Sequence, residues 1–72
     1  MKAIVNLNSG QKLTVQGLKS IVIDSGNKNI RTVTPEQIDK FLIFPNCSYV
    51  FSGESVISTK GESINYVEFN KS

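Results

Sequence analysis

Short runs of β-branched and aromatic residues, broken every few positions by Gly, Asn or Ser, set the main constraint on what this chain can form. β-Branched and aromatic residues favour strands, whereas Gly, Asn and Ser favour the turns between strands. The spacing predicts about six or seven short strands, over residues 2–7, 11–16, 18–24, 30–33, 49–52, 55–59 and 63–70. The sequence therefore predicts a mainly β fold.

One segment interrupts this rhythm with the start signal of a helix. Residues 34–37 (Thr-Pro-Glu-Gln) offer an N-cap hydroxyl, a proline at the first helical position and the glutamine of a capping box. Apolar side chains then follow at positions i, i+3 and i+4, the spacing of one helical face, in Ile38, Phe41 and Leu42. Pro45 ends the helix by Phe44 at the latest, and Ile43 and Phe44 are compatible with extended backbone. We expect one short α-helix within residues 34–44, with its apolar face plugging the core.

The strands predict how the sheet is arranged. Residues 2–7 and 11–16 predict a hairpin turned at Gly10, and residues 21–23 are apolar on both faces, which is typical of a central strand. The last three strands predict a meander. We expect a small meander or an SH3-like open barrel; a flat sheet with the helix packed on one face is the alternative.

The last strand carries apolar side chains on both of its faces. Ile64 and Tyr66 share one face, and Val67 and Phe69 share the other. A strand of this kind lies inside a sheet or meets a partner with its second face. Ile64, Tyr66, Val67 and Phe69 are therefore the candidate protein interface.

The small size of the chain favours association with a partner. A chain of 72 residues forms one domain, residues 1–72, and a core of this size supplies only about 3–5 kcal/mol. Disulfides, metals or partner chains usually supply the remainder. Cys47 is the one cysteine and there is no His, so neither a disulfide nor an ordinary metal site is expected, and no cofactor is predicted. Self-association or a host partner protein is the remaining route.

The same cysteine usage bears on location. Small secreted domains are rich in disulfides, so a lone cysteine predicts a cytoplasmic protein. The apolar run after Lys2 stops at Asn6, too soon for a secretory signal, and the longest apolar run, residues 41–44, is too short to span a membrane. We expect no membrane partner.

The charge of the chain is mildly positive and spread along its length. The formal net charge is +2. Basic residues of adjacent hairpins form a candidate basic patch, consisting of Lys12, Lys19, Lys28 and Arg31. Beside aromatic side chains, such a patch is typical of small nucleic-acid-binding barrels. A small nucleic-acid or nucleotide-binding β-barrel is therefore the alternative function.

No pattern of residues predicts catalysis. Cys47 falls in a stretch that is typical of an exposed loop, but no His is present to activate its thiol, so the sequence favours an ordinary small residue at the start of a strand. Nothing in the spacing of the six carboxylates brings two of them together, and the turn at residues 24–29 has one carboxylate and a lysine, which does not suit calcium. We predict no enzyme activity and no catalytic or metal site.

The glycine-separated run from residues 49–53 through Gly61 to residues 66–69 resembles small uncharacterised proteins encoded by bacteriophages and prophages of Gram-positive bacteria. The resemblance implies an accessory role, in which the protein binds and redirects a host or defence protein. The predicted function is a non-enzymatic protein-binding accessory module that acts through protein–protein contacts or homo-oligomerisation.

Overall fold

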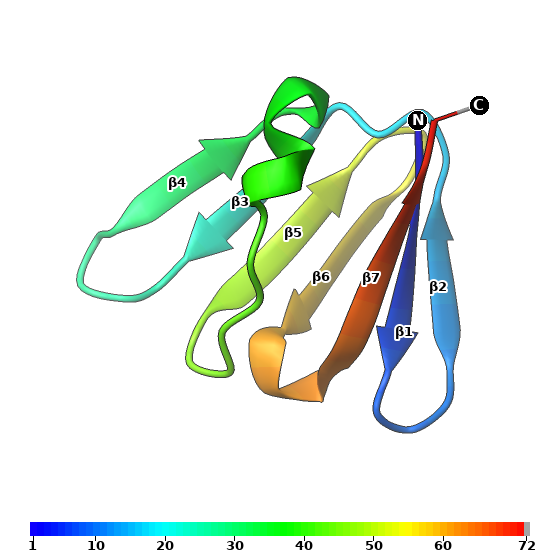
Figure 1. Cartoon of the computed structure of the whole chain (residues 1–72). Coiled ribbons are helices and arrows are strands. Elements are labelled where there is room, and N and C mark those ends of the chain that lie inside the picture. The colour runs from blue at the N-terminus through cyan, green and yellow to red at the C-terminus, as the bar shows by residue number, and fades with distance from the viewer. Residues whose placement is uncertain (72) are drawn as a thin grey trace.

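The computed structural model describes residues 1–71, and these form seven strands in two antiparallel sheets (Figure 1). The first sheet has the strand order β2-β1-β7 and consists of β1 (Lys2–Leu7), β2 (Lys12–Val15) and β7 (Ile64–Asn70). The second sheet has the order β4-β3-β5-β6 and consists of β3 (Ser20–Asp24), β4 (Ile30–Val33), β5 (Ser48–Ser52) and β6 (Val56–Lys60). The predicted mainly β fold is confirmed.

The predicted N-terminal hairpin is present. β1 and β2 pair with Ala3 opposite Val15 and Val5 opposite Leu13. Gly10 closes the turn at a φ of +95°, which residues with a side chain rarely adopt. Because side chains alternate along a strand, Ala3 and Val5 point to the same side, and both are fully buried.

β3 occupies the central position that its doubly apolar sequence predicts. It lies between β4 and β5, with Ile21 opposite both Val33 and Phe51. Ile21 and Ile23 face the core and are buried, whereas Val22 lies on the outer face and is half-buried. Apolar residues on both faces of a strand are typical where both faces are covered. The outer face of β3 is only partly covered, which leaves Val22 half-buried.

The last three strands do not form the predicted meander. β5 and β6 form a hairpin, but β7 pairs with β1, with Lys2 opposite Asn70, and lies at the edge of the first sheet. A short 3₁₀ turn, η2 (Gly61–Ser63), redirects the chain after β6. The Gly61 N–H donates to the Cys47 carbonyl at 2.7 Å, and this backbone contact fixes the point at which the chain leaves the second sheet.

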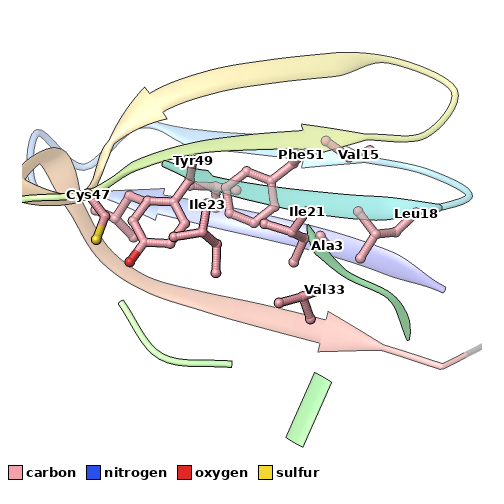
Figure 2. Close-up of a cluster of buried hydrophobic side chains, with 11 residues drawn as sticks. Ala3, Val15, Leu18, Ile21, Ile23, Val33, Cys47, Tyr49 and Phe51 are labelled. Carbon is pink, nitrogen blue, oxygen red and sulfur yellow. The ribbon is translucent and has the colours of Figure 1, made fainter. Parts of the chain in front are cut away.

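The core fills the space between the two sheets (Figure 2). On one side the sheets are joined where the turn after β5 meets the end of β2: the Glu54 N–H donates to the Gln16 carbonyl at 2.8 Å. The radius of gyration is 11.2 Å, close to the ~11 Å expected for a folded domain of this length. The buried core residues are Ala3, Val5, Val15, Leu18, Ile21, Ile23, Val33, Cys47, Tyr49, Phe51 and Ile64.

The segment after β4 is a 3₁₀ helix, η1 (Pro35–Lys40), where the sequence predicted an α-helix. Gln37 N–H donates to the Thr34 carbonyl and Phe41 N–H to the Ile38 carbonyl, which are the i to i+3 bonds of a 3₁₀ helix. Six residues are too few to stabilise an α-helix on their own. With three residues per turn, Ile38 and Phe41 share the buried side and Leu42 is left 61% exposed.

Phe41 fills the gap between the two sheets on the side away from the Glu54–Gln16 contact. This is the plugging role that the sequence predicted for this segment. Its ring makes edge-on contacts with Tyr49 and Phe51 of the second sheet, at centroid distances of 5.7 and 6.2 Å. It makes a third edge-on contact with Phe69 of the first sheet, at 5.6 Å. This one side chain therefore holds the edge of β7 against the second sheet.

Candidate functional site

A groove of about 480 Å³ lies between the β3–β4 hairpin and the loop that leads into β5. We call it the β4 groove. Its walls combine apolar side chains, two cations and small polar groups. The lining residues are Ile23, Ser25, Lys28, Asn29, Ile30, Arg31, Phe44 and Cys47.

The first wall is the tight turn between β3 and β4. Asp24 Oδ1 accepts a hydrogen bond from the Gly26 N–H at 2.8 Å, and Asn29 N–H donates to the Gly26 carbonyl at 2.9 Å. Asn27 and Lys28 follow with φ values of +53° and +63°. The left-handed conformation is common for Asn but uncommon for Lys. The turn therefore holds Lys28 at the groove in a conformation that a lysine seldom takes.

The second wall is the extended segment between η1 and β5, and Tyr49 fixes it from below. The Tyr49 hydroxyl accepts a hydrogen bond from the Phe44 N–H at 2.6 Å and donates one to the Leu42 carbonyl at 3.2 Å. Alternation along this segment turns Phe41 and Ile43 to the core and Leu42 and Phe44 outward. Burial raises the pKa of the Tyr49 phenol, although the hydrogen bond from Phe44 opposes the shift. The hydroxyl is therefore protonated, and able to donate, at neutral pH.

Two cations give the groove its charge. Arg31 stands opposite Ile23 across the ladder, so its side chain lies on the inner face of the second sheet. Lys28 lines the same groove from the turn. Of the residues that the structure describes, those lining the groove include no carboxylate. The groove is therefore a local site of positive charge on a chain whose net charge is only +2.

The groove also leaves large apolar side chains in solvent. Ile30 is 64% exposed and Phe44 is 47% exposed. Ile30 pairs with Asp24 and Arg31 pairs with Ile23, so the Ile30 side chain lies on the opposite face of β4 from Arg31. Phe44 is therefore the large exposed apolar side chain that stands beside the cations.

A second hollow of about 390 Å³ lies on the other side of Arg31, between β4 and η1. Glu36, Asp39 and Lys40 line it, so its charges are mixed. A side-chain hydrogen bond with Thr34 lowers the pKa of the Glu36 carboxyl below its usual value, and an exposed glutamate is ionised at neutral pH. The charge beside β4 therefore changes from positive at the turn to partly negative at η1.

The structure divides the predicted protein interface between two environments. Ile64 is 7% exposed and belongs to the core. Val67 and Phe69 are partly buried and pack against the core. Tyr66 is 50% exposed, opposite Asn6 on the outer face of the first sheet. The four residues therefore do not lie together on one exposed surface, and Tyr66 alone presents a large exposed side chain.

The structure brings together two members of the predicted basic patch. Lys28 and Arg31 line the β4 groove. Lys12 begins β2 in the first sheet, and Lys19 precedes β3 at the end of that strand far from the β3–β4 turn (Figure 1). Lys19 therefore lies at the opposite end of β3 from Lys28, and Lys12 lies in the other sheet, so neither lines the groove.

Sequence reasoning did not identify the two exposed apolar residues beside the groove, Ile30 and Phe44. The sequence placed the helix within residues 34–44 and left Ile43 and Phe44 open to an extended conformation, but it did not single out Phe44 as an exposed side chain. Pro45 held the usable signal, since the residue before a proline favours extended backbone. Ile30 carried no such signal, because an isoleucine at a strand start is equally common in a core.

The groups that could bind a metal ion or react as a thiol are few and scattered among the described residues. Residues 1–71 contain no cluster of three His, Cys, Asp or Glu side chains that would hold a metal ion. Cys47 is 6% exposed and lies just before β5, as an ordinary small residue at the start of a strand would, and not in an exposed loop. The turn from Phe44 to Cys47, closed by the Cys47 N–H donating to the Phe44 carbonyl at 3.1 Å, folds its side chain inward.

Comparison with protein-family models, with curated proteins and with solved structures finds no match for this chain. A search of residues 1–71 finds no helix with the length and apolar character needed to cross a membrane. The geometry of the β4 groove is therefore the observation that bears most directly on function.

Proposed function

We propose that this protein is a non-enzymatic binding module whose β4 groove receives part of a partner protein. The observation that carries the proposal is the placement of an exposed apolar side chain, Phe44, beside two cations, Lys28 and Arg31. Apolar walls with a few oriented polar groups, in a volume of this order, are typical of binding sites. An apolar anchor and a charged group of a partner would both find complementary neighbours there.

The groove is held open by contacts within the protein itself. Tyr49 binds the backbone of the Phe44 wall, and the Asp24 side chain binds the backbone of the opposite turn. A wall that is fixed before binding does not have to be ordered by the partner, which favours affinity. The support for protein binding is therefore both chemical and conformational.

A small nucleic-acid or nucleotide-binding barrel is the alternative function. The same two cations beside the exposed Phe44 ring support it, because phosphates pair with cations and bases stack on aromatic rings. With Lys12 and Lys19 outside the groove, however, the positive surface is short. Binding of a single strand usually needs a positive groove that follows several phosphates, so protein binding has more support.

The test is capture of a partner with matched variants. Tagged full-length protein is incubated with a lysate of the cells that produce it, with and without nuclease, and bound proteins are identified by mass spectrometry. Phe44→Ser removes an apolar wall of the groove, and Val56→Ser removes a comparably exposed side chain on β6. Neither side chain belongs to the buried core, so both variants should fold.

The proposal predicts one stoichiometric protein that resists nuclease, is retained by Val56→Ser and is lost with Phe44→Ser. A partner that both variants retain would contradict the groove as the binding site. Nuclease-sensitive recovery of nucleic acid would favour the alternative function.

The biological setting is part of the same proposal. The resemblance to phage and prophage proteins and the lone cysteine support an accessory protein that acts in the cytoplasm on a host protein or on a second copy of itself. Identification of the captured partner tests this setting directly.

A further inference from the structure

β4 offers an unpaired edge beside the β4 groove. It is the last strand of its sheet and pairs only with β3. No other segment within residues 1–71 donates a backbone hydrogen bond to β4 or accepts one from it. An unpaired edge strand is a template for pairing with another chain.

The register shows which backbone groups are free. Ser25 N–H donates to the Asn29 carbonyl at 3.1 Å, which makes Ser25 and Asn29 a hydrogen-bonded pair. Pairs of this kind alternate along an antiparallel ladder, so Arg31 and Val33 bond to β3 while Ile30 and Thr32 turn their N–H and C=O groups outward. Two residues at the free edge therefore present both a donor and an acceptor.

Charge selects what would bind at this edge. At the turn, Lys28 and Arg31 favour an anionic group, and no carboxylate among the described residues lines that groove. At the other end, Glu36 and Asp39 line the second hollow and disfavour a further anion there. A segment lying along β4 would therefore place its acidic side chain near the turn.

We infer that the occupant of the β4 groove is an extended acidic segment of the partner protein, which adds to the second sheet as a strand beside β4. This inference rests on the proposed function and names the chemistry of the partner. The backbone of the segment bonds to Ile30 and Thr32, and an Asp or Glu side chain lies between Lys28 and Arg31. An apolar side chain two positions away in the segment, on the same face as the acidic one, covers Phe44. Strand addition explains affinity, and the two side chains explain selectivity.

The first experiment selects ligands without assuming a partner. A display library of random 12-residue peptides is panned against the tagged full-length protein, and the enriched peptides are synthesised. The inference predicts enrichment of an acidic residue within a run of β-branched or aromatic residues. Absence of enrichment, or enrichment of peptides without an acidic residue, would overturn it.

The second experiment uses one selected peptide to test the charge contact with Arg31 and the backbone pairing with β4 separately. Arg31→Ala should weaken binding roughly tenfold to a hundredfold, since it removes a charge-assisted hydrogen bond, and Lys60→Ala on β6 should leave it unchanged. N-methylation of the peptide at alternate positions should abolish binding in one of the two alternating sets and spare the other, because only one set faces β4.

Amide hydrogen exchange distinguishes strand addition from a contact between side chains alone, because only strand addition protects the backbone amides of β4. The N–H groups of Ile30 and Thr32 should exchange more slowly when the peptide is bound. Tight binding with unchanged exchange at these two residues would contradict strand addition, and binding of oligothymidylate in competition with the peptide would contradict the choice of a protein segment. If a partner protein is captured by the wild type and lost with Phe44→Ser but the peptide tests fail, the proposed function stands and this inference is wrong. If capture of the partner does not depend on Phe44, the proposed function itself is wrong.

Discussion

Replacing Tyr49 with Phe tests whether the phenol holds the outer wall of the groove. The substitution keeps the buried ring and its contact with Phe41 but removes the oxygen that accepts from the Phe44 N–H and donates to the Leu42 carbonyl. A partly buried donor that loses its partner costs about 1–3 kcal/mol. For a domain of this size, each kcal/mol lowers the midpoint of thermal unfolding by roughly 4–8 °C.

The effect of pH on Tyr49 adds a second readout. Burial raises the pKa of the phenol in the folded state, whereas an unfolded tyrosine has a pKa of about 10. The unfolded state therefore releases its proton first, and the free energy of unfolding falls as pH rises from about 10 through the folded-state pKa. Tyr49→Phe removes this contribution, so its stability should fall less steeply in alkali than that of the wild type.

The assay is denaturant unfolding at pH 7 and at several pH values above about 9.5. Tyr66→Phe is the matched control, because the Tyr66 side chain is half exposed. We expect this control to change the free energy of unfolding by less than about 0.5 kcal/mol and to keep the wild-type alkaline slope. If Tyr49→Phe matches the control in both respects, the phenol does not hold the wall and the reasoning is refuted.

Two further substitutions test the backbone contact at η2 and the aromatic plug. Gly61→Ala should lower the free energy of unfolding by several kcal/mol, because the new Cβ would clash with the Phe44 carbonyl and lie 2.9 Å from the Tyr49 ring. Gly26→Ala is the control: it has open space around it and should cost only about 1–2 kcal/mol, from the strain of left-handed backbone. Thermal unfolding measures both. Equal losses would refute the close approach. Phe41→Ala should lower the free energy of unfolding by about 3–5 kcal/mol, enough to unfold much of the population. Leu42→Ala should keep a circular dichroism spectrum near that of the wild type, because the Leu42 side chain is exposed. A larger loss of structure in Leu42→Ala than in Phe41→Ala would restore the α-helical assignment of this segment.

The parts of the fold that follow from local patterns were predictable from the sequence. Alternation fixed the buried side of β1, with Ala3 and Val5 inside, and the doubly apolar run at residues 21–23 identified the central strand. Gly10 and the turn before Ile30 marked two hairpins. These features depend on residues close to one another in the chain, which is the range over which periodicity and turn chemistry act.

The pairing of β7 with β1 was not predictable by the same reasoning. Nothing in the sequence of residues 61–63 separates a hairpin turn from the 3₁₀ turn that sends β7 to the other sheet. That choice is made by the close packing of Gly61 against the backbone of Phe44 and Cys47, which lie far from it in sequence. A contact of this kind becomes visible only when the tertiary arrangement is known.

The candidate site was predictable only in part. Lys28 and Arg31 were among the predicted basic residues, but Ile30 and Phe44 were not singled out, and the interface predicted on β7 places three of its four residues against the core. Binary patterning identifies apolar faces, yet it does not show which face a second sheet covers. The extended backbone expected before Pro45 did not show, in the same way, whether the Phe44 ring would face the core or the solvent.

Amide hydrogen exchange of the full chain, alone and with the captured partner protein, tests the central claim most directly. The account predicts slower exchange on binding in residues 28–33 and 44–47, the segments that form the β4 groove and the free edge of β4. Protection confined to residues 64–70, or absent from both regions, would contradict it.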